Sequence, residues 1–230
     1  MGCFMEKFIK YSFVSKEEKT KHYLLTFDDD FNILRKFKLP KTMSSFVALE
    51  NNKCSHCPLK NSCSKNCPVA ENMAHILQSF NDKCSFNTTK VIVETNERII
   101  VKETEFQYAI QSLIGLVMAT SGCPHFSFFK SMARFHLPFS TLEETIVRAI
   151  SFYLFHNFVN DEPSYNLKGL NKIYEKVIIV NRNMLLRFKD LPFSGDANQN
   201  AISILDSFAQ MVPLEISSKM QCLTKFQKAS

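Results

Sequence analysis

The sequence Ile-Lys-Tyr-Ser-Phe at residues 9–13 decides how the chain begins to fold, because apolar and polar residues alternate along it. The alternation returns at residues 22–27, His-Tyr-Leu-Leu-Thr-Phe, after a charged stretch at 16–21. A period of two places alternate side chains on one face of a β-strand. The two segments therefore predict an antiparallel hairpin.

Further strands are expected on the C-terminal side of this hairpin. Three consecutive aspartates at 28–30 indicate a turn, and the alternation over 33–39 predicts a third strand that ends before Pro40. Residues 91–95 and 98–101 predict a second hairpin, joined by a short polar turn. The sequence thus predicts three to five antiparallel strands.

The rest of the chain shows mainly helical periodicity. Pro68 suits the first position of a helix whose N-cap would be Cys67, and Thr141 with Glu144 matches a capping box. Helices are expected at about 68–80, 105–119, 141–158, 167–188 and 197–212, with a break at 192–195. We expect an α+β fold in a single domain, 1–230. Hairpins, a Cys-rich loop and one helix would occupy 1–104, and the helical part 105–221.

Composition and charge narrow the functional classes. The chain has 230 residues, 45% of them hydrophobic, with 22 phenylalanines and no tryptophan, which predicts a sizeable aromatic core. The net charge of +6 is spread among acidic residues without a basic run, which argues against nucleic-acid binding. There is no apolar leader, and the longest apolar stretch, 109–119, is too short to span a bilayer. The expectation is a cytoplasmic protein without a membrane span, for which a protein partner stays open.

The strongest chemical signal is a cluster of cysteines with the spacing Cys54-x2-Cys57-x5-Cys63-x3-Cys67. Thiolates this close repel one another and lose solvation on burial, so a neutralising cation explains their density. A reducing cytosol disfavours structural disulfides. The cluster therefore predicts a zinc ion or an iron–sulfur cluster, between which the spacing does not decide.

A fifth cysteine is a candidate remote ligand. Cys123 lies in Ser-Gly-Cys-Pro-His at 121–125, and this loop could close on the first cluster and replace Cys63. His56 and His125 supply possible nitrogen ligands. Three other interpretations stay open: reduced thiols without an ion, a small buried thiol at Cys123, and a haem thiolate at a Cys-Pro pair.

A second group of chemically active residues follows in the sequence. Arg134, His136, Glu143 and Glu144 lie close together before and at a predicted helix start. A catalytic interpretation makes His136 a general base beside a carboxylate, with Arg134 holding an anionic substrate. A structural one gives the glutamates to helix capping and to pairing with Arg148.

Several motifs together resemble a family of uncharacterised bacterial proteins. They are Cys-x2-Cys-Pro at 54–58, Cys-Pro-Val-Ala at 67–70, Ser-Gly-Cys-Pro at 121–124 and Ala-Arg-Phe-His-Leu-Pro-Phe at 133–139. The resemblance covers most of the chain and implies no activity. The family pattern has no firm cysteine at position 63 and tends to have proline at the place of Ser131. It thereby implies Cys54, Cys57, Cys67 and Cys123 as the ligand set.

Two functional hypotheses follow. In the first, a cytosolic protein uses its cysteine-ligated metal to stabilise its fold or to sense metal or redox state. In the second, a redox protein or metal-dependent enzyme uses the cluster with His125 and His136. The sequence contains no phosphate-binding loop, dinucleotide fingerprint or nucleophile elbow that would assign a reaction, so whether the protein is an enzyme stays open.

Overall fold

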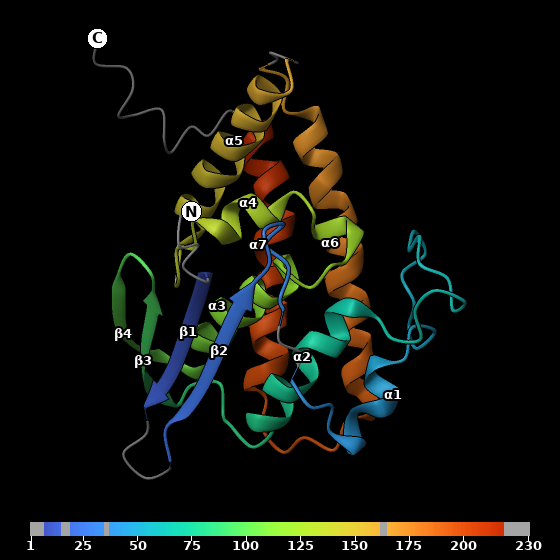
Figure 1. The fold of residues 1–230 in the computed structure, drawn as a ribbon, viewed down its shortest axis with the longest axis vertical. Coiled ribbons are helices and arrows are strands. Elements are labelled where there is room, and N and C mark those ends of the chain that lie inside the picture. Colours follow the sequence, from blue (N-terminus) through green and yellow to red (C-terminus); the bar gives the residue numbers. More distant parts are fainter. Residues whose placement is uncertain (1–6, 15–18, 35–36, 162–164, 219–230) are drawn as a thin grey trace, which may run out of the picture.

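A four-stranded antiparallel sheet forms the N-terminal part of the fold (Figure 1). The computed structural model describes residues 7–14, 19–34, 37–161 and 165–218. The strands are β1 (Lys7–Val14), β2 (Lys21–Phe27), β3 (Thr88–Thr95) and β4 (Ile99–Glu105), in the order β2-β1-β3-β4. Both predicted hairpins are confirmed, and β1 joins them by pairing with β3 as well as with β2.

The third strand predicted at 33–39 is wrong in the part of that segment that the structure describes. Only Ile33 forms a bridge, an isolated one to Phe27. Phe31 adopts a positive φ of 59°, and the backbone N–H of Ile33 bonds to the carbonyl of Thr120 at 3.1 Å. The chain therefore turns from the sheet edge toward the loop that carries Cys123.

The helices occupy the predicted regions and add several short ones. The longer helices are α2 (Pro68–Ser79), α3 (Phe106–Ala119), α5 (Leu142–Val159), α6 (Lys168–Leu186) and α7 (Ala197–Ser217). The short ones are η1 (Lys41–Met43), α1 (Ser44–Val47), η2 (Pro124–Phe126), α4 (Phe129–Arg134) and η3 (Arg187–Asp190). The α+β class is confirmed, with strands near the N-terminus and helices through the rest.

The core lies between the sheet and the helices. Along β1, Ile9, Tyr11 and Phe13 are buried on one face, as their alternation predicts. Phe13 packs on Phe80 at the end of α2, with ring centroids 4.7 Å apart. In Figure 1, α3 and α7 lie behind the sheet and α6 runs beside α7; α7 contacts both α3 and α6. Helix α3 thus passes through the centre of the molecule, which explains its nearly continuous apolar sequence.

The break predicted at 192–195 docks the start of α7 on the turn after α2. The N–H of Gly195 donates to the carbonyl of Asn81 at 2.8 Å, and a Cβ at Gly195 would lie 2.3 Å from the carbonyl oxygen of Lys83. This approach admits only glycine. Helix α7 continues beyond the predicted end at residue 212, with Pro213 inside it.

None of the helices in the described residues combines the length and the apolar composition needed to cross a bilayer.

Candidate metal centre

Two of the predicted ligands share one tight turn. The N–H of Cys57 donates to the carbonyl of Cys54 at 3.0 Å, which places the two residues at the ends of a single turn. The loop that contains this turn leaves α1 and enters α2, and in Figure 1 it projects beside α6. Its two ends are joined by a bridge between Ala48 and Asn66.

Cys67 and Cys123 occupy equivalent positions in their segments. Cys67 is the N-cap of α2, as predicted, and Cys123 is the N-cap of η2. Each has an extended backbone (φ −71°, ψ 121° and φ −69°, ψ 127°) and precedes a proline in the first helical turn. The sulfur of Cys67 accepts no capping hydrogen bond from α2.

The four thiols Cys54, Cys57, Cys67 and Cys123 lie close enough to affect one another's ionisation. Burial, and then the neighbouring thiols Cys67 and Cys57, raise the pKa of Cys54 to about 11. Burial also raises the pKa of Cys123 to about 12; a hydrogen bond from the His125 backbone opposes this, and the other three thiols add to it. Three separate chain segments therefore bring their sulfurs into one neighbourhood that resists the charge of free thiolates.

Cys63 lies outside this group. Its side chain is exposed and its sulfur contacts the hydroxyl of Ser62 at 3.7 Å. Of the cysteines without partner spacing, Cys84 is exposed, and Cys3 and Cys222 lie outside the described residues. Within the part of the chain that the structure describes, no three His, Cys, Asp or Glu side chains are arranged to hold a metal ion. The four neighbouring thiols are thus not a preformed coordination shell.

Two histidines join the cysteine-bearing segments. The rings of His56 and His125 stack with centroids 3.9 Å apart. Nε2 of His125 donates to the carbonyl of His56 at 3.1 Å, and Nε2 of His56 donates to the carbonyl of Lys176 in α6 at 3.2 Å. Since Nε2 carries the proton, Nδ1 of a neutral His56 is an acceptor, and it is buried without a partner among the described residues. His56 therefore offers a nitrogen ligand close to Cys57.

A buried arginine lies near the four thiols, and no sequence pattern predicted it. Arg187 is 2% exposed, and its guanidinium donates to the carbonyls of Phe46 (2.5 Å), Ala48 (2.9 Å) and Leu49 (3.4 Å). Burial lowers the pKa of Arg187, and the thiols of Cys67, Cys54 and Cys57 oppose this. No carboxylate pairs with it among the described residues, and its Nε has no partner there.

The second candidate group has a different environment. His136 shares a 2.5 Å hydrogen bond with the hydroxyl of Tyr11, and not with a carboxylate. Burial, with a smaller contribution from the charge of Arg148, lowers the pKa of His136 to about 3, so the imidazole is neutral and weakly basic. Glu144 forms the predicted capping box with Thr141. His125 stacks on His56 instead of approaching this group.

Among the residues that the structure describes, Arg134 contacts an aromatic ring and no polar partner. Its guanidinium lies over the ring of Phe31, 5.8 Å from the centroid. The nearby Arg148 instead donates to the backbone carbonyls of Met132 and Phe135. Arg148 therefore stabilises the backbone at the end of α4, and Arg134 packs on an aromatic ring.

Comparison with known proteins gives a family but no activity. The sequence model of a domain of unknown function, DUF6901, matches residues 9–228. No curated protein matches the chain. No solved structure matches it either. Because the match spans nearly the whole sequence, the chain belongs to the DUF6901 family.

Proposed function

We propose that this protein binds one metal centre, a zinc ion or an iron–sulfur cluster, through the thiolates of Cys54, Cys57, Cys67 and Cys123. The centre would join three segments of the chain and so stabilise the fold, or report metal or redox state through it. The proposal includes a cytoplasmic location, because a reducing environment keeps the thiols available as ligands.

The observation that carries the proposal is the buried guanidinium beside the thiols. A buried charge without a counter-charge is costly, and carbonyl hydrogen bonds compensate it only in part. The ionisable groups that act on Arg187 are three of the four thiols. Four thiolates around Zn²⁺ leave two negative charges in excess, which Arg187 would partly neutralise. The arginine therefore fits an anionic metal–thiolate centre better than neutral thiols.

Because the four thiols do not form a coordination shell on their own, the bound ion would bring their segments together. Without a cation, burial and the neighbouring thiols oppose the ionisation of Cys54 and Cys123, because they raise the pKa of both groups. Metal binding replaces the protons and couples the convergence of the segments to the binding energy. We therefore expect the loop between α1 and α2 to depend on the metal for its order. His56 Nδ1, which is buried without a partner among the described residues, would be an alternative nitrogen ligand of the same centre.

Metal analysis of protein purified without oxygen tests the proposal. We expect about one equivalent of zinc in a colourless protein, or iron and sulfide in a brown one with visible charge-transfer absorption. The two results also decide which centre is present. Protein that contains neither zinc nor iron would contradict the proposal.

Serine substitutions test the ligand set. Cys54→Ser, Cys57→Ser, Cys67→Ser and Cys123→Ser should each lose most of the bound metal, because each removes a thiolate. Cys63→Ser and Cys84→Ser are matched controls at exposed positions and should keep the wild-type metal content. Circular dichroism of each variant separates loss of metal from loss of the fold. Equal losses at all six positions would exclude the proposed set.

A further inference from the structure

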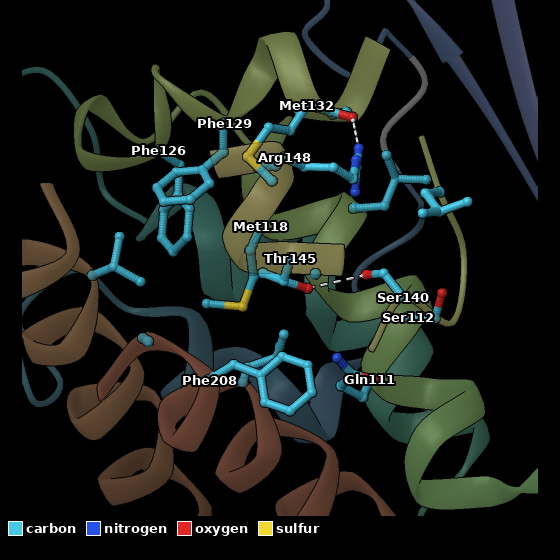
Figure 2. Close-up of a pocket in the computed structure, with 18 of the residues that line it drawn as sticks. Gln111, Ser112, Met118, Phe126, Phe129, Met132, Ser140, Thr145, Arg148 and Phe208 are labelled. Carbon is cyan, nitrogen blue, oxygen red and sulfur yellow. Dashed lines mark hydrogen bonds between the residues drawn. The ribbon is translucent and has the colours of Figure 1, made fainter. Parts of the chain in front are cut away.

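A cavity of about 160 Å³ lies among α3, α4, α5, α6 and α7 (Figure 2). Figure 2 shows Phe126 and Phe129 on one side, Phe208 from α7 below them, and Ser112 and Ser140 on the opposite side. The wall is thus apolar toward the phenylalanines and polar toward the serines. The cavity is separate in the fold from the thiol group, because Cys54, Cys57, Cys67 and Cys123 are not among its lining residues.

Two buried polar atoms of the cavity wall have no hydrogen-bond partner in the part of the chain that the structure describes. Tyr174 is 3% exposed and Asn181 is 1% exposed, and both line the cavity from α6. The Tyr174 hydroxyl and Oδ1 of Asn181 make no hydrogen bond within the described residues. Leaving such a group unsatisfied costs about 1–3 kcal/mol, so native structures usually satisfy it with water or a ligand.

The same wall carries a cation. Arg148 lines the cavity, and its Nη2 donates to the carbonyls of Met132 (2.8 Å) and Phe135 (2.9 Å). Its Nε and Nη1 make no hydrogen bond to any residue that the structure describes. Glu144 acts on it at a distance, but that carboxylate is exposed and accepts from the N–H of Thr141. Burial raises the pKa of Tyr174, and the nearby charge of Arg148 opposes this in part.

We propose that this cavity is a binding site for a small monocarboxylate with an apolar body. The carboxylate accepts from the free nitrogens of Arg148 and from the Tyr174 hydroxyl. The apolar part of the ligand packs among Phe126, Phe129 and Phe208. Neither the metal proposal nor the family match assigns this site.

Charge and size select this class of ligand. One guanidinium balances one negative charge, whereas a phosphate dianion would leave a charge buried without a partner. The other titratable group of the wall, His136, is neutral and bonded to Tyr11. A cavity of about 150 Å³ in another protein holds a benzene molecule, so the apolar body should be of about that size.

Calorimetric titration of the full-length protein with benzoate and with benzamide tests the proposal. The two probes have nearly the same shape, and only benzoate is charged at neutral pH. Benzoate should bind saturably and about tenfold more tightly than benzamide, because a charge-assisted pair is stronger than a neutral one. Equal affinity for the two probes, or no binding of benzoate, would overturn the proposal.

Removal of one hydroxyl supplies the matched variant. Tyr174→Phe should weaken benzoate binding about tenfold while leaving the thermal stability of the free protein unchanged or raised, because the hydroxyl has no partner to lose. Tyr153→Phe, at a tyrosine outside this cavity, should bind benzoate like the wild type. If Tyr174→Phe also binds like the wild type, the hydroxyl faces only water and the proposed site is wrong.

Discussion

His136 is a neutral imidazole in the folded chain, bonded to Tyr11 and close to the charge of Arg148. Tyr11 in turn shares a hydrogen bond with Ser112 at 2.8 Å, and the hydroxyl of Ser112 accepts from the N–H of Phe139 at 3.0 Å. This chain of bonds connects β1, α3 and the loop before α5. A proton on His136 would therefore bring charge into a network that has no carboxylate to receive it.

Acidification should destabilise the protein through His136. Its pKa of about 3 in the folded state lies below the ordinary value of 6.5, so the unfolded chain takes up the proton first. The stabilisation is fully present above about pH 6.5 and is lost as pH falls toward 3, at up to about 1.4 kcal/mol per pH unit. The contribution of His136 to the free energy of unfolding should therefore be about 2 kcal/mol smaller at pH 5 than at pH 7, and urea unfolding at the two pH values measures it.

His136→Gln isolates this contribution, since glutamine keeps a polar group but does not titrate. The variant should lose less stability than the wild type between pH 7 and pH 5. His156→Gln, at an exposed histidine of α5, should behave like the wild type. An unchanged pH dependence in His136→Gln would show that the folded protein accepts the proton at this position.

At single positions, the sequence predicted roles that depend on near neighbours in the chain. The N-cap at Cys67 and the capping box at Thr141 need only residues within one helical turn. Arg187 shows the opposite case, because its partners lie about 140 positions earlier and its own surroundings are those of an ordinary helix end. The placement of Cys123 near Cys54 likewise depends on tertiary packing; the sequence allowed it as one alternative, and the family resemblance favoured it.

Among the elements, α5 shows how a local signal fixes a helix start. The hydroxyl of Thr141 accepts from the N–H of Glu144, whose carboxylate accepts from the N–H of Thr141. Thr141→Ala should lower the free energy of unfolding by about 1 kcal/mol, because the backbone N–H of Glu144 loses its acceptor. Chemical denaturation measures the change.

Ser151→Ala is the matched control for this substitution, since Ser151 is exposed in the interior of the same helix. Its effect should lie within about 0.5 kcal/mol of zero. If the two variants have the same stability, the capping box does not support α5.

Hydrophobic periodicity predicted most elements, and two departures have physical reasons. Residues 33–39 alternate like a strand, but the turn from Asp28 to Asn32 and the bond from Ile33 to Thr120 direct the chain away from β2. Helix α7 continues through Pro213 to Ser217, although the predicted helix ends at residue 212. Proline removes one backbone donor, and packing of α7 on α3 and α6 outweighs that local loss.

At the scale of the whole molecule, the sheet order depends on the pairing of β1 with β3, residues separated by about 80 positions. No turn signal specifies such a pairing, so the sequence predicted two hairpins without their arrangement. The group of four thiols also depends on packing between distant segments, because it combines the loop before α2 with the loop after α3. The resemblance to an uncharacterised family is confirmed at the level of the family.

Removal of the proposed metal should loosen one part of the molecule and leave the rest intact. After treatment with a chelator, amides in 50–66 and 121–126 should exchange with deuterium at least about tenfold faster, because the ion that joins these segments is gone. Amides of β1 and β3, which pair with strands on both sides, serve as the internal control. A uniform change, or none, would contradict a centre placed between these loops.

The contacts of Arg187 with Phe46 and Ala48 also determine when the site can form during translation. A nascent chain cannot place a guanidinium beside the thiols until residue 187 has left the exit tunnel of the ribosome. The cysteine loop therefore emerges more than a hundred residues before the charge that favours thiolates. Delivery of the proposed ion or cluster would accordingly follow the emergence of residue 187, after an interval in which the thiols of the loop face oxidants without that charge.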